Sequence, residues 1–267
     1  MAAKISVLYV DDEPGLLEIG KLFLERSGQF SVDITTSASA ALDMLSQSSY
    51  DAIISDFQMP GMDGITLLKK IRGSGNTIPF IILTGRGSED IVIQALNEGA
   101  SYYLQKGGKL LPQFTEIAHQ VRHAVQKRNA ETDIGNLEHR VKNILDFLPE
   151  AVFTIDRNGT VTVWNAAIEI MTGIPAKEML GKGECAWAIP FFGHPEPTLI
   201  NLVIDPNITV PDRYETIARK GPILVAETIL TQGNDASVVL EERASPLLRR
   251  NGEIDGAIEL VRKISKK

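Results

Sequence analysis

Apolar residues between positions 5 and 104 fall alternately into short continuous runs and into series with helical spacing. The series recur every three or four positions, which is typical of amphipathic helices. Strands that alternate with helices favour an α/β domain in which a doubly wound parallel sheet is covered on both faces. The runs predict five strands, at Ile5–Val10, Phe30–Ile34, Ala52–Ser55, Phe80–Thr84 and Tyr102–Leu104.

From residue 108 to 149 the spacing is purely helical. The apolar positions form two series, Phe114, Ile117, Val121 and Ala124, then Ile134, Leu137, Val141, Ile144 and Leu148. The second series steps by three and four in turn, as in the heptad of a coiled coil that pairs two copies of a chain. The two series are out of phase, which predicts an offset or break near Gly135. An ordinary terminal helix is the alternative to a dimerising linker helix over 129–147.

After Pro149 the pattern changes to that of an antiparallel sheet. An Arg157-Asn158-Gly159 turn joins two runs into a hairpin, and a middle part with helical spacing follows. The expected strands are Val152–Asp156, Val161–Trp164, Ile223–Leu230, Val238–Leu248 and Ile258–Ile264, and the expected helices are Ala166–Met171 and Lys177–Leu180. The chain therefore divides into an α/β domain at 1–128, a linker helix at 129–147 and an α+β domain at 148–264.

Composition narrows the class of protein. The chain has 27 Lys and Arg against 34 Asp and Glu, a net charge of −7, which disfavours nucleic acid and anionic membranes as partners. A single cysteine excludes an internal disulfide bond. The sequence shows neither a long apolar run nor the apolar core of a signal peptide, so we expect a cytoplasmic protein.

Polar side chains gather at the predicted strand ends of the first domain. Ligands of open parallel sheets bind outside the carboxyl ends of the strands. Carboxylates brought together there repel one another, which favours a hard divalent cation, and Mg²⁺ suits a site with few carboxylates and several waters. A hydroxyl and an ammonium group beside them suit a tetrahedral anion. The residues concerned are Asp11, Asp12, Asp56, Thr84 and Lys106.

Four motifs in this order resemble those of a receiver domain. They are Asp11-Asp12-Glu13-Pro14, the segment 56–64 (DFQMPGMDG), Thr84-Gly85, and the segment 99–106 (GASYYLQK). Residues 1 to about 128 are thus similar to the CheY-like receiver of a two-component response regulator, and the resemblance implies a flavodoxin-like fold. It also implies a sensor histidine kinase as partner.

The resemblance assigns a role to individual residues. Asp56 is the expected phosphoacceptor, and Asp12, Asp56 and the backbone carbonyl of Gln58 are the expected Mg²⁺ ligands, with Asp11 acting through water. Lys106 and Thr84 are expected to contact the phosphoryl oxygens, and Thr84 with Tyr103 to form the switch. Gln58 and Arg86 are expected to tune the lifetime of the phosphorylated state. A receiver promotes its own phosphorylation and dephosphorylation, so we expect no stand-alone kinase activity.

Residues from about 148 to 264 resemble a PAS domain. The motifs are the segment 149–167, Thr172-Gly173, Leu180-Gly181-Lys182 and the closing hairpin around Asn251-Gly252. The resemblance implies a five-stranded sheet with helices over one face and a cavity for an unidentified ligand. Neither Cys185 nor His194 stands in a pattern that favours flavin or haem. The expected output is contact with a downstream protein or a small ligand.

Two rival functions remain at this point. Residues 138–143 (EHRVKN) resemble the phosphoacceptor box of a histidine-kinase class, so His139 could act with a separate catalytic subunit. Alternatively, the PAS domain is the sensor and the receiver serves only for association. A solvated helix face is the plainer interpretation of His139.

Overall fold

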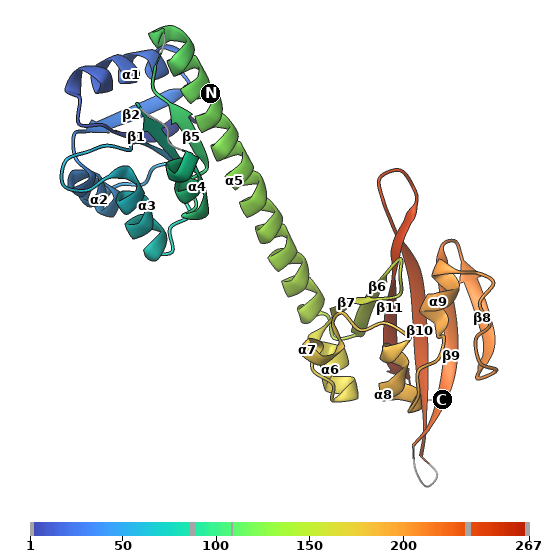
Figure 1. Ribbon diagram of the computed structural model, residues 1–267. Helices are drawn as coiled ribbons and strands as arrows, with labels where there is room; N and C mark the ends of the chain where they lie inside the picture. Colours follow the sequence, from blue (N-terminus) through green and yellow to red (C-terminus); the bar gives the residue numbers. More distant parts are fainter. Residues whose placement is uncertain (1–2, 86–88, 108, 233–235, 265–267) are drawn as a thin grey trace. The chain divides into compact units, whose positions relative to one another are not determined.

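The computed structural model describes residues 3–85, 89–107, 109–232 and 236–264. The chain divides into two compact units, Met1–Gly135 and Asn136–Lys267 (Figure 1). The first unit is built on a parallel sheet and the second on an antiparallel sheet. Each unit is taken by itself below.

The first unit has a five-stranded sheet in the order β2-β1-β3-β4-β5, and every pair of neighbours is parallel. This confirms the predicted α/β class. The strands are β1 (Ile5–Val10), β2 (Phe30–Thr35), β3 (Ala52–Asp56), β4 (Phe80–Thr84) and β5 (Tyr102–Gln105). The helices between them are α1 (Pro14–Arg26), α2 (Ala38–Gln47), α3 (Gly64–Gly73) and α4 (Glu89–Asn97).

Helices cover both faces of this sheet, which explains why its central strands are continuous apolar runs. On one face, Leu17 of α1 and Ile117 of α5 (Leu110–Phe147) pack against Val7 and Ile54. On the other face, helices α2, α3 and α4 pack against alternate residues of the same strands. Side chains on both faces are fully buried in β3 and β4, so the sheet holds the strand ends in fixed positions.

Arg72 lies at the edge of the sheet formed by the amino ends of the strands, opposite the carboxyl ends where Asp11 and Asp56 lie. Its guanidinium donates hydrogen bonds to the carbonyls of Asn76, Ile78 and Gly99 at 2.8, 2.8 and 2.9 Å. These carbonyls precede β4 and β5, so one side chain fixes the start of both strands to the end of α3. Burial, followed by repulsion from Arg128, lowers the pKa of Arg72.

Helix α5 runs without interruption from Leu110 to Phe147, 38 residues in all. The predicted offset or break near Gly135 is therefore wrong. A glycine costs a helix only about 1 kcal/mol relative to alanine, and hydrogen bonds on both sides outweigh that cost. The change of phase has another origin. The residues Phe114, Ile117 and Val121 are buried in the first unit, whereas Ile134, Leu137, Val141 and Ile144 of the later series are exposed and Leu148 is half-buried.

The second unit has a six-stranded antiparallel sheet in the order β7-β6-β11-β10-β9-β8. The α+β class is confirmed, but the expectation of five strands missed β8. The strands are β6 (Ala151–Asp156), β7 (Val161–Trp164), β8 (Tyr214–Lys220), β9 (Ile223–Gln232), β10 (Ala236–Leu248) and β11 (Ile254–Ile264). The helices are α6 (Ala166–Thr172), α7 (Ala176–Met179), the 3₁₀ turn η1 (Ala186–Ala188), α8 (Ile189–Phe192) and α9 (Leu199–Ile204).

Asn165 joins the end of α5 to the second sheet. Its amide nitrogen donates to the carbonyls of Leu145 and Glu150 at 2.8 and 3.0 Å, and its Oδ1 accepts from the backbone N–H groups of Val152 and Ile168. The side chain is 1% exposed and caps α6. Within the described residues, no helix is long and apolar enough to cross a membrane.

Candidate functional site

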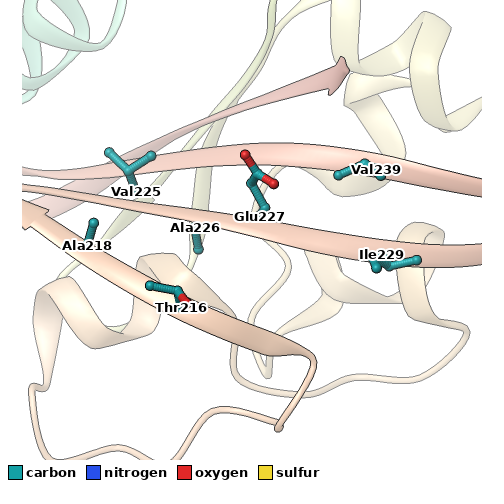
Figure 2. A pocket seen from close by; sticks show the side chains of 7 residues that line it. All are labelled: Thr216, Ala218, Val225, Ala226, Glu227, Ile229 and Val239. Carbon is teal, nitrogen blue, oxygen red and sulfur yellow. The ribbon is translucent and has the colours of Figure 1, made fainter. Parts of the chain in front are cut away.

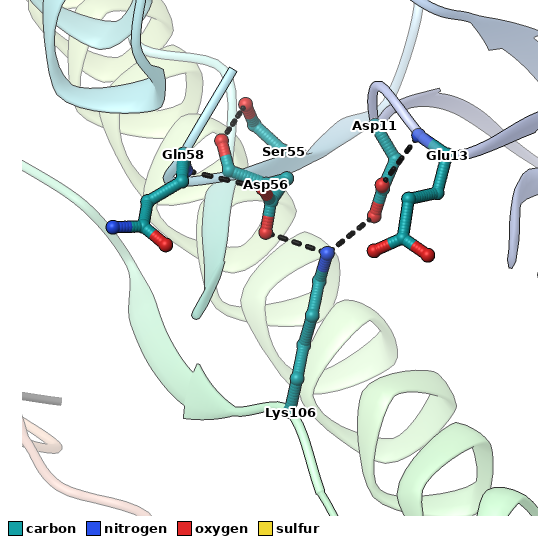
Figure 3. Close-up of polar contacts among 6 residues, drawn as sticks. All are labelled: Asp11, Glu13, Ser55, Asp56, Gln58 and Lys106. Atoms are coloured by element: carbon teal, nitrogen blue, oxygen red, sulfur yellow. Dashed lines mark hydrogen bonds and ion pairs between the residues drawn. The ribbon is translucent and has the colours of Figure 1, made fainter. Parts of the chain in front are cut away.

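The parallel strands bring the sequence-predicted acids together at one edge of the first sheet. Figure 3 shows two of them, Asp11 and Asp56, with Lys106 between them. Asp11, Asp12 and Asp56 each have a carboxylate oxygen within 4.8 Å of the others. Lys106, directly after β5, extends between two of them: its Nζ lies 2.7 Å from Asp11 Oδ2 and 2.6 Å from Asp56 Oδ1. The site therefore gathers three carboxylates, of which Asp11 and Asp56 are ion-paired with one ammonium group.

Local backbone geometry fixes the two buried carboxylates. The N–H of Gln58 donates to Asp56 Oδ2 at 3.1 Å, and the N–H of Glu13 donates to Asp11 Oδ1 at 3.1 Å. Each bond runs two residues forward from an aspartate, as in an Asx turn. Asp56 therefore keeps one oxygen on the backbone and the other on Lys106, while Asp11 does the same.

Two residues that support the site, Ser55 and Gly64, were assigned no role from the sequence, although Gly64 ends the motif at 56–64. The hydroxyl of Ser55 donates to the carbonyl of Asp56 at 2.9 Å. A Cβ on Gly64 would lie 2.4 Å from that same carbonyl oxygen, so only glycine lets α3 start so close to β3. The sequence held a signal for each residue. Ser55 is a hydroxyl residue at the end of an apolar run, and Gly64 directly follows Asp63, the N-cap of α3.

The charges of the site act on one another. Burial raises the pKa of Asp56; Lys106 opposes this through hydrogen bonding and charge, and repulsion from Asp11 adds to it. For Lys106, burial lowers the pKa, but Asp11 and Asp56 outweigh burial and raise it overall. Burial also raises the pKa of Tyr9, and the nearby charges of Asp11 and Asp56 add to that rise. Lys106 is thus held firmly as a cation among the acids.

The remaining predicted residues lie around this centre. Thr84 ends β4 and is fully buried, and the backbone N–H of Lys106 donates to its carbonyl at 2.6 Å. Tyr103 lies on β5, half-buried against the core under α2–α4, and its hydroxyl is buried without a hydrogen-bond partner in the described part of the chain. Arg86 lies outside the described residues.

The donor set fits a hard divalent cation. All three acidic side chains offer oxygen ligands, and a single ammonium leaves the cluster with excess negative charge. Asp12 is exposed whereas Asp11 and Asp56 are buried, so solvent reaches one side of the cluster. An open groove lined by Asp12, Gln58, Met59, Pro60 and Asp63 adjoins that side.

The second unit offers no comparable cluster among its described residues. Cys185 is partly buried in a left-handed backbone conformation (φ 57°), and burial raises its thiol pKa. His194 pairs with Glu196 at 3.3 Å, and His139 is exposed on α5 with its Nδ1 3.2 Å from the amide nitrogen of Asn143. A pocket on the sheet is lined by Thr216, Ala218, Val225, Ala226, Glu227, Ile229 and Val239 (Figure 2).

Comparison with protein families matches each unit. Residues 7–111 match the response regulator receiver domain, and residues 139–184 match the PAS fold. The chain thus carries the receiver domain of a two-component response regulator followed by a PAS domain. These matches do not favour the alternative in which His139 is a phosphoacceptor.

Individual relatives are response regulators or transcriptional regulators. Response regulator Rre1 of Synechocystis is 36% identical over 146 residues, which cover 54% of this chain and 62% of that protein. Transcriptional regulatory protein FixJ of Bradyrhizobium diazoefficiens is 33% identical over 106 residues, 40% of this chain and 51% of that protein. A receiver domain structure from Clostridium thermocellum, 29% identical, covers 47% of this chain and 98% of its own, with a TM-score of 0.43.

The chain spans only about half to three fifths of the length of these two curated relatives. Both alignments are shorter than the chain. The similarity therefore concerns the aligned part of each relative and not the functions of its remaining residues.

Proposed function

We propose that Asp56 receives a phosphoryl group from a phosphohistidine of a partner kinase and that the state of Asp56 controls the output of the PAS domain. The observation that carries this proposal is the placement of the Asp56 carboxylate, 2.6 Å from Lys106 Nζ and beside two further acids. In the transfer, a carboxylate oxygen of Asp56 attacks phosphorus, the P–N bond breaks, and the imidazole nitrogen leaves.

Mg²⁺ would be held by Asp12, Asp56 and the backbone carbonyl of Gln58, with Asp11 acting through water. When bound, the ion neutralises negative charge on the transferring group. Lys106 is already ion-paired with Asp56, so after transfer its ammonium would remain on the phosphoryl oxygens as the carboxylate loses its charge. Thr84 would donate its hydroxyl to another of these oxygens.

Tyr103 and Thr84 would form the switch. Their strands are hydrogen-bonded neighbours, with Ile82 opposite Tyr103 and Thr84 opposite Gln105. A shift of Thr84 toward a phosphoryl group would free space along β4 for the Tyr103 ring. The buried Tyr103 hydroxyl, which lacks a hydrogen-bond partner in the described residues, makes its present position less costly to leave.

Labelling with acetyl phosphate and Mg²⁺ tests the proposal. The wild-type chain should become phosphorylated at a base-labile site, and Asp56→Asn should not. Asp43→Asn, an exposed aspartate on α2, is the matched control and should label as wild type does. Base-stable labelling of Asp56→Asn at the wild-type level would show that the phosphoacceptor has been misassigned.

We also infer that the chain pairs with a second copy through α5. Ile134, Leu137, Val141 and Ile144 are 58%, 62%, 47% and 56% exposed, and their three-four spacing is that of a seam that self-associates. Leu137→Lys should convert a dimer to a monomer in light scattering, whereas Lys142→Glu on a polar face should not. A wild-type monomer at high concentration would contradict the inference.

Several sequence-based expectations stay proposals: domain limits of 1–128, 129–147 and 148–264, a place in the cytoplasm, and an output through a protein or small ligand on the PAS domain. Tuning of the phosphate lifetime by Gln58 and Arg86 is likewise proposed.

A further inference from the structure

Two glutamates lie in the interior of the second unit. Glu242 on β10 and Glu259 on β11 are each 2% exposed. Their strands are paired so that Glu242 lies opposite Val261 and Ala244 opposite Glu259. The two glutamates are therefore diagonal neighbours on one face of the sheet, and their carboxyl groups lie within hydrogen-bonding reach of each other.

The pair connects four elements. Glu242 Oε2 accepts a hydrogen bond of 2.8 Å from the hydroxyl of Tyr214 on β8. Glu259 Oε2 accepts one of 2.8 Å from the backbone N–H of Ile200 on α9. The Tyr214 hydroxyl also accepts from the N–H of Leu199, at 3.2 Å. Helix α9 and strand β8 are thus attached to β10 and β11 through these two carboxyl groups.

The surroundings do not neutralise two negative charges. A cavity of about 10 Å³ adjoins both carboxyl groups and has room for about one water molecule. Its walls include Phe153, Trp187, Phe191, Phe192, Thr198, Leu240 and Val261. Glu242 Oε1 is buried and receives no hydrogen bond of ordinary geometry from the described residues.

Charged groups near the pair are few. Arg213 attracts Glu242, but its guanidinium is ion-paired with Glu196 and lies 3.9 Å from the centre of the Phe192 ring. His194 pairs with the far side of Glu196, at 3.3 Å. On β9, the buried hydroxyl of Thr228 also lies close to Glu242, and Glu227 is exposed. The one nearby arginine is therefore already shared with another acid.

Two adjacent buried carboxyl groups are most stable when one carries a proton. Burial raises the pKa of Glu259 well above its usual range, and repulsion from Glu242 adds to this. Burial also raises the pKa of Glu242, while the nearby hydroxyl groups of Tyr214 and Thr228 and the carboxyl group of Glu259 lower it. Because both pKa values are raised, the pair as a whole holds a proton that an isolated glutamate would release.

We propose that Glu242 and Glu259 form a single-proton binding site in the core of the second unit, and that its occupancy controls how firmly α9 and β8 are held on the sheet. The site makes the second unit responsive to proton activity. It shares no residue with the phosphoacceptor site, so either proposal can fail without the other.

The sign of the pH dependence follows from linkage. Because the folded unit binds a proton that the unfolded chain releases near the usual glutamate pKa of 4.5, stability falls as pH rises above that value. A difference of one proton raises the unfolding equilibrium constant up to tenfold per pH unit. The effect ends where the folded site itself loses its proton.

Urea unfolding of the full chain between pH 5 and 8, followed by tryptophan fluorescence, measures this slope. Both tryptophans, Trp164 and Trp187, belong to the second unit, so the signal reports that unit alone. Glu259→Gln keeps a carbonyl for Ile200 and an amide donor for Glu242 but cannot titrate. The slope should persist in Glu227→Gln, an exposed control on β9, and fall markedly in Glu259→Gln.

Infrared spectroscopy of the wild-type chain keeps the proposal testable if Glu259→Gln does not fold. A carbonyl stretch of one protonated carboxyl group should be present at pH 6, shift in ²H₂O, and disappear at higher pH with a rise in exchange of α9 and β8 amides. The absence of such a band at pH 6, or equal slopes in Glu259→Gln and Glu227→Gln, would overturn the proposal.

Discussion

Replacing Lys106 by methionine should expose how strongly the candidate site depends on one ammonium group. Methionine keeps the apolar length of the side chain but removes its charge. The Asp11 and Asp56 side chains are 0% and 7% exposed, so both acids would stay buried without their cation. Removing one partner of a buried ion pair costs about 3–5 kcal/mol. Because the Lys106 side chain is 15% exposed, we expect a loss of about 3 kcal/mol, the lower end of this range.

Native-state hydrogen exchange of peptides from β3 and β4 measures this loss in the full chain, with peptides from β10 as an internal reference. Lys69→Met is the matched control. Its ammonium lies 3.0 Å from Glu98 Oε1, but the two side chains are 46% and 36% exposed, and such surface pairs contribute about 0–1 kcal/mol.

Two further measurements sharpen the test. The deficit of Lys106→Met should shrink as pH falls, because a proton can replace the ammonium. Mg²⁺ should also stabilise Lys106→Met, by about 2.7 kcal/mol at a hundred times its dissociation constant, because the ion supplies positive charge where the ammonium is missing. If Lys106→Met loses no more stability than Lys69→Met, the electrostatic account of the site is refuted.

Three other changes test the surrounding structure. Mg²⁺ affinity, measured by calorimetry, should begin to fall at a pH above 3.8, the ordinary pKa of an aspartate, as the pH is lowered. The reason is that burial raises the pKa of Asp56, and its proton must leave before the ion binds. A fall that begins only at pH 3.8 or below would contradict this. Gly64→Ala should destabilise the first unit by about 1–3 kcal/mol in hydrogen exchange, whereas Gly73→Ala, with open space around it on the same helix, should not. Asn165→Ala should cost the second unit about 2–3 kcal/mol in urea unfolding, since it leaves buried backbone groups without partners; a loss below 1 kcal/mol would argue against that role.

The sequence predicts those elements of the fold whose pattern of apolar and polar residues is unambiguous. Strands buried on both faces, such as Ala52–Asp56, begin as apolar runs, and the polar residues at their carboxyl ends identify the edge of the sheet that carries the site. Strand β8 was missed because Tyr214–Lys220 mixes charged and apolar residues, as an edge strand can. The continuity of α5 depends on a sum of hydrogen bonds that a lone Gly135 does not reveal.

The site itself divides in the same way. The identity of Asp11, Asp56 and Lys106 follows from motif and strand position, but the contact of one ammonium with both acids depends on tertiary distances. The buried pair in the second unit carried a signal that was not used. Glu242 shares the period-two face of Leu240 and Ala244, which is the interior face of β10.

The two edges of the first sheet, one held by the hydrogen bonds of Arg72 and the other carrying the acids, differ in how readily their polar contacts can change. The guanidinium of Arg72 is planar, donates to three carbonyls and stays protonated at physiological pH, so the hydrogen bonds at its edge of the sheet do not change with pH. At the other edge the cation is Lys106, a single ammonium on a flexible stem, and under the proposed function its pairing with Asp11 and Asp56 would change when a metal ion or a phosphoryl group arrives. Arg72 binds the backbone carbonyls of Asn76, Ile78 and Gly99 and not their side chains. Substitutions at these three positions should therefore be limited mainly by the backbone conformation that each residue must adopt.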